Sequence, residues 1–290
     1  MRRIKIGLTL PVSYLADQAS SPSALLWTEM FPTVSACLAE LREWGVNSIE
    51  INELNPSTDP DLIEHAAEAI LSSGLQITVH GWLPMGSSQE ELIRLLAVVE
   101  RSLRRSGHGE AIACTVHGHH ASDPPDKMQA TEWTIRDLAS LVSMLADQDS
   151  LWVPALEVCR HKAGGPVGVT YGEVLDMADQ VSQAELGVCW DVGHSQVNYV
   201  RFGHEPFPDQ AFISRLIHTH IHDILPNGKT HGPLVKIDGY VRECLAMMQA
   251  GGYEGVYNLE LYPIRWEGTP QERKDALRVS IGNLRTMLEG

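Results

Sequence analysis

Six short apolar runs in this chain each end on a side chain that can bind a divalent metal ion. These side chains are His80, His117, Glu157, Asp191, His220 and Glu260, and His194 follows closely after Asp191. Imidazole nitrogens and carboxylate oxygens are both common ligands of divalent cations. A carboxylate at the end of a buried strand is unfavourable unless a positive charge stabilises it. The repeated pattern therefore predicts a metal centre built from the ends of several strands.

The balance of charge around these residues favours a metal over chance. A single histidine after a strand is more often an ordinary loop residue than a ligand. Glu157, Asp191 and Glu260 are different, because few basic residues follow the strands to neutralise them. Carboxylates that share one rim without a cation repel each other and raise each other's pKa values. A bound metal ion makes the same arrangement favourable.

The elements that must carry these residues alternate regularly along the chain. Eight apolar runs begin near residues 3, 46, 75, 111, 151, 186, 215 and 255. Between them lie segments with apolar residues at helical spacing, such as Leu92, Leu95, Leu96 and Val99. Eight strand–helix units predict an α/β fold, a (β/α)8 TIM barrel with eight parallel strands. In that fold the carboxyl ends of all strands lie on one face, so the candidate ligands converge there.

A doubly wound open sheet is the structural alternative. That fold usually has a glycine-rich phosphate-binding turn after its first strand, and GLTLPVS is not such a turn. Pro154 is an objection to a regular fifth strand, because proline removes a ladder donor, and we expect that strand to be irregular. No linker or change in composition interrupts the chain, which predicts a single domain over residues 1–290.

Composition and charge disfavour several classes of partner. The 290-residue chain has a formal net charge of −15 and dispersed basic residues, so no nucleic-acid partner is expected. The chain has no apolar run long enough for a membrane span, and its N-terminus reads as a first strand rather than a signal peptide. Five cysteines without a CxxC pattern suggest neither disulfides nor a zinc knuckle. We expect a cytoplasmic protein, and a homo-oligomer stays open.

The same residues resemble the xylose isomerase-like barrel superfamily, which includes sugar and sugar-phosphate isomerases and epimerases and endonuclease IV. The matching motifs are ALEV with Glu157, WDVGH with Asp191 and His194, HTHIHD with His220, NLEL with Glu260, and THGPL with His231. They occur in order over nearly the whole chain. The resemblance implies that one divalent ion is held by Glu157, Asp191, His220 and Glu260. It also implies that the two glutamates move the substrate proton.

The implied reaction is isomerisation or epimerisation of a small-molecule sugar or sugar phosphate, by proton abstraction next to a carbonyl through a metal-stabilised enediolate. Mn, Mg, Zn and Co all suit these ligands, and a second ion stays open. His80, His117, His194 and His231 are candidates for substrate binding or an additional metal. Trp82, Lys229 and Trp266 are the candidates for lining the pocket.

Two other activities fit the same scaffold. In the endonuclease IV branch, additional His and Asp residues hold three zinc ions for phosphodiester hydrolysis. His80, His117, His194 and His231 match much of that set, but Lys229 stands where the branch has an Asp. A sugar or inositol-derivative dehydratase is the other alternative, because it also needs proton abstraction beside a carbonyl. A barrel that only binds a sugar is disfavoured by the intact carboxylates.

Overall fold

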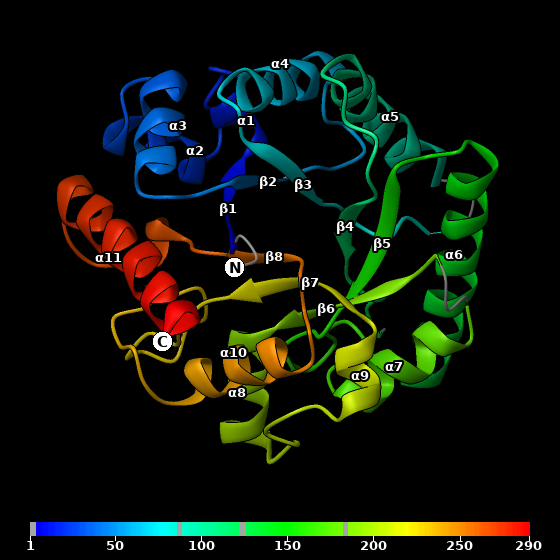
Figure 1. Ribbon diagram of the computed structural model, residues 1–290. Coiled ribbons are helices and arrows are strands. Elements are labelled where there is room, and N and C mark those ends of the chain that lie inside the picture. Colours follow the sequence, from blue (N-terminus) through cyan, green and yellow to red (C-terminus); the bar gives the residue numbers. More distant parts are fainter. Residues whose placement is uncertain (1–3, 86–88, 122–125, 182–184) are drawn as a thin grey trace.

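Eight parallel strands close into one barrel in the order of the chain, and helices form a ring outside it (Figure 1). The computed structural model describes residues 4–85, 89–121, 126–181 and 185–290. The strands are β1 (Lys5–Pro11), β2 (Ser48–Asn52), β3 (Gln76–His80), β4 (Ile112–Val116), β5 (Trp152–Glu157), β6 (Gly187–Asp191), β7 (Leu216–Ile221) and β8 (Val256–Leu259). Each predicted apolar run overlaps one of these strands, so the predicted TIM barrel is confirmed.

The helices cover the outside of the barrel because each has one apolar face. They are α1 (Val12–Leu15), α2 (Pro22–Met30), α3 (Val34–Glu43), α4 (Pro60–Ser72), α5 (Gln89–Arg105), α6 (Lys127–Asp147), α7 (Tyr171–Asp179), α8 (Val192–Phe202), α9 (Gln210–Ser214), α10 (Tyr240–Ala250) and α11 (Pro270–Glu289), with a 3-10 turn η2 (Pro263–Arg265). In α5, Leu92, Leu95 and Leu96 are buried, whereas Arg101 on the other face is exposed. This spacing is what an amphipathic helix requires.

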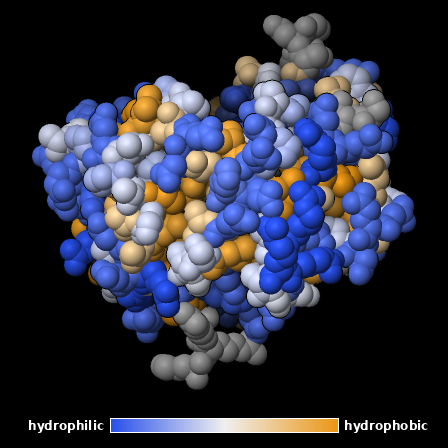
Figure 2. Space-filling model, turned by 90° about the horizontal axis from the view of Figure 1, so that it is seen from above, coloured by the Kyte–Doolittle hydropathy of each residue, from blue (hydrophilic) through white to orange (hydrophobic). Residues whose placement is uncertain are grey.

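Strand residues are buried on both faces of the sheet. Every residue of β2 and of β6 is buried, because inward side chains fill the barrel and outward ones pack against helices. Hydrophilic residues are interspersed with smaller apolar areas on the side of the molecule shown in Figure 2. None of the helices in the described part of the chain has the length and apolar character of a membrane span.

The fifth strand is regular at Pro154, so the expected irregularity is wrong. β5 runs without interruption from Trp152 to Glu157, and Pro154 pairs with Cys114 of β4. The other neighbour, β6, pairs with β5 only from Ala155 onward. Because the proline lies before that pairing begins, its missing N–H removes no ladder hydrogen bond to β6. The irregularity in this part of the sheet lies between β6 and β7 instead, where the register shifts.

Candidate metal centre

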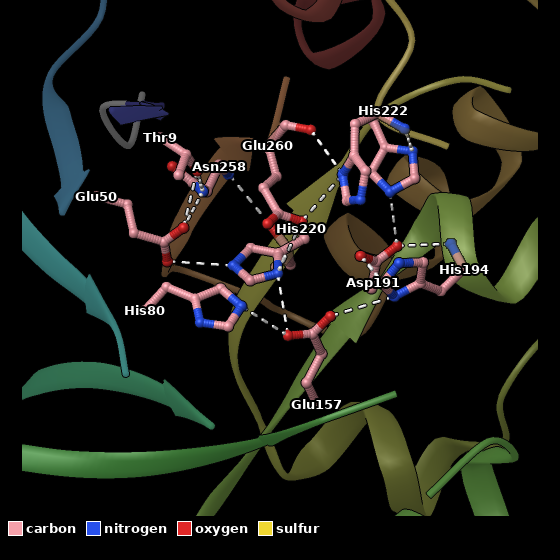
Figure 3. Close-up of polar contacts among 12 residues, drawn as sticks. Thr9, Glu50, His80, Glu157, Asp191, His194, His220, His222, Asn258 and Glu260 are labelled. Atoms are coloured by element: carbon pink, nitrogen blue, oxygen red, sulfur yellow. Dashed lines mark hydrogen bonds and ion pairs between the residues drawn. The ribbon is translucent and has the colours of Figure 1, made fainter. Parts of the chain in front are cut away.

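Four of the predicted ligands meet at the carboxyl ends of four consecutive strands. Glu157 ends β5, Asp191 ends β6, His220 lies near the end of β7, and Glu260 directly follows β8. Asp191 pairs with His220 across the β6–β7 ladder, which places both at one height in the barrel. All four are at most 2% exposed. The barrel therefore brings together residues that are far apart in the sequence (Figure 3).

The donor atoms of these four residues are close enough to share one cation. One oxygen or nitrogen from each lies within 4.8 Å of the others. His220 Nδ1 lies 3.4 Å from Glu157 Oε2 and 3.6 Å from Glu260 Oε2. Ligands on opposite sides of an ion with bonds of about 2.1 Å are about 4.2 Å apart. The observed spacing is compatible with a divalent metal.

Several of these donor atoms have no hydrogen-bond partner among the described residues. They are both carboxylate oxygens of Glu157, Asp191 Oδ2, His220 Nδ1 and Glu260 Oε2. Buried polar atoms without hydrogen bonds are rare, and within the described ranges the carboxylate oxygens here have only histidine nitrogens at 3.0–3.6 Å as neighbours able to carry a positive charge. The unpartnered atoms belong to the four residues that share the centre, and one divalent cation could satisfy them together. This observation shows that the site fits a metal better than residue type alone could.

Three further predicted histidines surround the same carboxylates. His80 Nε2 and His117 Nε2 lie 3.3 Å and 3.0 Å from Glu157 Oε2. His194 Nδ1 lies 3.3 Å from Glu157 Oε1 and 3.0 Å from Asp191 Oδ2. Asp191 is also the N-cap of α8, since its Oδ1 accepts a hydrogen bond from the backbone N–H of His194. The start of α8 therefore fixes how Asp191 and His194 face the centre.

Burial and neighbouring charges act in opposite directions on these groups. Burial lowers the pKa of His194, but Asp191 and Glu157 outweigh it and raise the pKa to about 10. Burial also lowers the pKa of His80, but Glu157 raises it to about 9. Burial raises the pKa of the Glu157 carboxyl, but His117 and His220 hold it well below its usual value. The carboxylates are therefore ionised at neutral pH, as metal ligands and general bases must be.

Glu50 in β2 orients the ligand histidine from inside the barrel. Glu50 Oε2 accepts hydrogen bonds from His220 Nε2 at 3.1 Å and from His218 Nε2 at 2.9 Å (Figure 3). Thr9 and Asn258 donate to the other oxygen, Oε1, at 2.8 and 3.0 Å. With its Nε2 proton held by Glu50, His220 turns Nδ1 toward Glu157 and Glu260, and a bound metal ion would take this nitrogen unprotonated. Glu50 therefore fixes both the tautomer and the direction of the ring.

A second cluster of histidines lies beside the four ligands. His194, His222 and His231 have ring nitrogens within 4.8 Å of one another, so they could hold a further cation. His222 Nε2 lies 3.1 Å from Asp191 Oδ1, and His231 Nδ1 lies 3.3 Å from Glu260 Oε2. The two clusters are therefore joined through shared carboxylates. His231 was predicted to lie near the site, and the structure places it there.

His231 is held in a left-handed backbone conformation, with φ 64°. Non-glycine residues adopt this conformation only when their surroundings impose it. The N–H of His231 donates to His222 Nδ1 at 3.0 Å, and its C=O accepts from Trp266 Nε1 at 2.9 Å. Burial lowers the pKa of His231 to about 4, outweighing Glu260, which keeps the ring neutral. A neutral imidazole is the form that binds metals.

A cavity of about 430 Å3 opens beside the metal centre, within the range of about 300–1,000 Å3 that is typical of small-molecule sites. Its lining includes five of the predicted residues, namely His80, His117, His194, His231 and Glu260. The other lining residues come from the end of β2, such as Asn52, and from segments that follow strands, including His120, Arg160 and Tyr262. The size and the polar lining suit one sugar-sized molecule.

The three predicted pocket residues do not line this cavity. Trp82 is half-buried and packs against the hydrophobic core. Trp266 is buried, and its indole N–H holds the backbone of His231 rather than facing the cavity. The Lys229 side chain is exposed. The large aromatic rings are used to pack the loops against the barrel, because this removes their apolar surface from water.

Sequence reasoning missed the positive residues of the cavity. Arg160, Lys162 and Arg265 line it, and Tyr262 donates a hydrogen bond to Glu260 Oε1 at 2.8 Å. A signal was present in the sequence, since Arg160 and Lys162 follow closely after Glu157 in the segment EVCRHK. The sequence did not indicate that Arg265 lines the cavity, because its position there depends on the turn η2.

Comparison with known proteins adds a family and several similar folds. The family described as "Xylose isomerase-like TIM barrel" matches residues 38–287. No curated protein matches the chain by sequence. Among solved structures, a D-allulose 3-epimerase from Methylomonas sp. is 15% identical, with a TM-score of 0.62 and coverage of 99% of each chain.

Two further solved structures are similar at the same level. An L-ribulose 3-epimerase is 14% identical, with a TM-score of 0.65, and the match covers 99% of this chain and 95% of that chain. The IOLI protein, solved with a zinc atom, is 13% identical, with a TM-score of 0.62 and coverage of 100% and 98%. At such identities the likeness shows a shared fold.

Proposed function

Because the chain belongs to the xylose isomerase-like TIM barrel family, we propose that it is a divalent-metal-dependent isomerase or epimerase of a sugar or sugar phosphate. One observation carries the proposal. Glu157 and Glu260 reach a common centre from different strands, with unpartnered carboxylate oxygens beside Asp191 and His220. The two 3-epimerases share this fold, and the IOLI protein holds zinc, which supports the same interpretation.

Glu157 and Glu260 are the two groups placed to move a proton. Burial raises the pKa of the Glu260 carboxyl, but the imidazole of His231, 3.3 Å from Oε2, and the charge of His220 hold it well below its usual value. Both glutamates are therefore ionised and can accept the proton from the carbon next to the substrate carbonyl. Tyr262 occupies Oε1 of Glu260, which leaves Oε2 free to face the centre.

The product of the proposed reaction depends on the carbon atom and the face to which the proton is returned. A bound divalent cation would polarise the carbonyl and the adjacent hydroxyl and stabilise the enediolate. One glutamate removes the proton and the other returns it. Return to the opposite face of the same carbon gives an epimer, whereas return to the former carbonyl carbon gives an aldose–ketose isomer. His194 lines the cavity and can hold a substrate oxygen.

Exchange of solvent deuterium into the substrate tests the assignment of the two glutamates. We expect Glu157→Gln and Glu260→Gln each to reduce exchange at least about 100-fold, because a carboxamide cannot accept the proton. Glu243→Gln, at an exposed position of α10, is the control and should keep wild-type exchange. Exchange that survives in both site variants would refute the proposed roles. The measurement is NMR of sugars incubated with metal-loaded protein.

A second candidate function is phosphodiester hydrolysis, which one observation favours. The cluster of His194, His222 and His231 could hold another cation next to the four ligands. Hydrolases with two or three metals use them to stabilise the attacking and leaving oxygens. The net charge of −15 opposes binding of DNA, so we expect no cleavage of abasic DNA at low salt. Rapid cleavage, together with more than one metal per chain by elemental analysis, would replace the isomerase proposal.

We also propose that the protein works on small molecules in the cytoplasm, without nucleic-acid or membrane partners. The described cysteines are all buried and free, which suits a reducing compartment. A dehydratase acting on a related substrate would be distinguished in the exchange experiment, because the substrate would lose water and the product would have a lower mass than the substrate.

A further inference from the structure

Three positive side chains line the cavity, and together they are called its positive wall. Arg160 and Lys162 follow β5, and Arg265 lies in the turn after β8. No ion pair joins any of them to a carboxylate within the described ranges, although the chain as a whole is strongly acidic. The carboxylates that line the cavity, Glu53 and Glu260, have other partners, Ser21 and Tyr262. The wall is therefore a local excess of positive charge.

Among these three residues, Arg160 is the one whose backbone is held in place by a buried side chain. Asn198 of α8 is 2% exposed and holds the backbone on both sides of Arg160. Its amide donates to Cys159 O at 2.9 Å, and its Oδ1 accepts from His161 N at 2.8 Å. The Arg160 Nε atom is inaccessible to water and has no hydrogen-bond partner among the described residues. A buried donor without an acceptor is unfavourable, so turning the side chain toward an anion in the cavity would be stabilising.

Two neighbouring arginines make the positive charge of Arg160 less favourable when no anion is bound. Burial lowers the pKa of Arg160, and the nearby Arg201 and Arg265 lower it further. Arg265 lies over the Tyr262 ring at 4.7 Å, and that ring's hydroxyl bonds the proposed catalytic Glu260. Like charges gathered without a counter-ion repel each other, and the repulsion is relieved when an anion binds between them. The positive wall is thus connected to the metal centre through one tyrosine.

We propose that the substrate carries an oxyanion, a phosphate or a carboxylate, and that Arg160, with Lys162 and Arg265, binds it. The proposal rests on the proposed function for the identity of the reacting end. A guanidinium forms paired hydrogen bonds with either oxyanion, and both are stronger than bonds between neutral groups. The cavity then has two ends. The carboxylate and imidazole end takes the carbonyl and hydroxyl oxygens, and the positive end takes the charged group.

Binding of matched ligands tests this assignment independently of turnover. Isothermal titration of the metal-loaded protein, with Glu157 and the other metal ligands intact, would compare a ketose phosphate, a sugar acid and the corresponding neutral ketose. We expect the charged ligands to bind at least about tenfold more tightly than the neutral one, which corresponds to about 1.4 kcal/mol. The preferred charged ligand identifies the oxyanion as phosphate or carboxylate.

The decisive variant is Arg160→Gln in the same background. It should weaken binding of the charged ligand at least about tenfold and leave binding of the neutral ketose unchanged, because only one charged contact is removed. Arg160→Lys should restore part of the affinity. Arg242→Gln removes an equal charge at an exposed position of α10 and should have no effect. Thermal melts verify that the variants are folded.

The outcomes separate this proposal from the proposed function. If Arg160→Gln binds both ligands as tightly as the parent does, the anion site is refuted, and exchange of a neutral sugar would still support the isomerase. If charged ligands bind through Arg160 but no sugar undergoes exchange, the anion site stands and the proposed reaction fails. Equal affinity for charged and neutral ketoses would also refute the anion site.

Discussion

The two ring nitrogens of His220 have different tasks, and the difference is set by one buried carboxylate. Nε2 donates to Glu50 Oε2, and Nδ1 faces Glu157 and Glu260. Burial raises the pKa of Glu50, but His220 and His218 outweigh it and lower the pKa well below its usual value. Glu50 therefore stays ionised inside the barrel and acts on the metal centre through the histidine.

Replacing Glu50 with Gln should weaken metal binding about 10–100-fold, as loss of a partner that orients a ligand histidine commonly does. Four donors converge on the Glu50 carboxylate, and a carboxamide would present its own N–H groups to some of them. His220 would then lose its fixed tautomer. Metal affinity is measured by titration with a competing chelator.

The control for this prediction is Glu243→Gln, which removes the same charge from the surface of α10. Wild-type affinity in a folded Glu50→Gln protein would show that His220 needs no partner to present Nδ1.

At the scale of elements, α8 connects the metal centre to the positive wall. Its N-cap is Asp191, and Asn198, two turns later, holds the segment after β5. Asn198 makes three hydrogen bonds of 2.8–2.9 Å to Cys159, Val169 and His161. One helix therefore positions a ligand at its start and the backbone around Arg160 further along.

Asn198→Ala should destabilise the protein by about 3 kcal/mol, because it leaves two buried carbonyls and one partly buried N–H without partners. The midpoint of urea unfolding reports the change. Asn227→Ala is the matched control, since Asn227 is exposed and accepts one local hydrogen bond from Lys229 N. Equal midpoints for the two variants would contradict the structural role of Asn198.

The start of α11 offers a second prediction at this scale. Thr269 and Glu272 form a capping box, in which each side chain bonds the backbone of the other. Thr269→Ala should cost about 1 kcal/mol of stability, because orphan N–H groups of the first turn lose their acceptor. Thr286→Ala, at an exposed position of the same helix, should cost much less. Thermal unfolding distinguishes the two, and a larger loss for Thr286→Ala would count against the cap.

For the whole molecule, closing the sheet concentrates three buried carboxylates at one rim. These carboxylates are ionised, and oxygens without hydrogen bonds to any described residue point to a common centre. A bound cation should therefore stabilise the folded state, in addition to the enediolate of the proposed reaction. A metal present at about 100 times its dissociation constant stabilises a protein by about 2.7 kcal/mol. At this size, that corresponds to an increase of roughly 5–10 °C in Tm.

Removal of metal with a chelator should therefore lower the Tm by about this amount, and added Mn, Mg, Zn or Co should restore it. The measurement is differential scanning calorimetry of the same protein with and without chelator. A variant with Glu157→Gln and Asp191→Asn should show no response to either treatment. A wild-type Tm that is unaffected by both would leave no stabilising metal to explain the unpartnered carboxylates.

The sequence alone determined the fold class and predicted that acidic and imidazole side chains converge at the strand ends. Apolar residues recur with strand and helix periods that depend only on near neighbours in the chain, so eight strand–helix units could be counted. A parallel barrel places every strand end on one face, which predicts that the side chains at the strand ends converge. The resemblance to xylose isomerase-like barrels then singled out Glu157, Asp191, His220 and Glu260 as the proposed ligands. His231 could be placed by its motif.

Only the tertiary structure decided which other side chains belong to the site. Glu50 meets His220, and Arg160 approaches Arg265, across distances in sequence that no local period encodes. Trp82 looked like a pocket residue because it follows a strand, but its side chain packs against the core. Pro154 is tolerated because β5 begins to pair with β6 only at the next residue, Ala155. The register of the strands and the direction of their side chains depend on how the barrel closes, and closure involves all eight strands together.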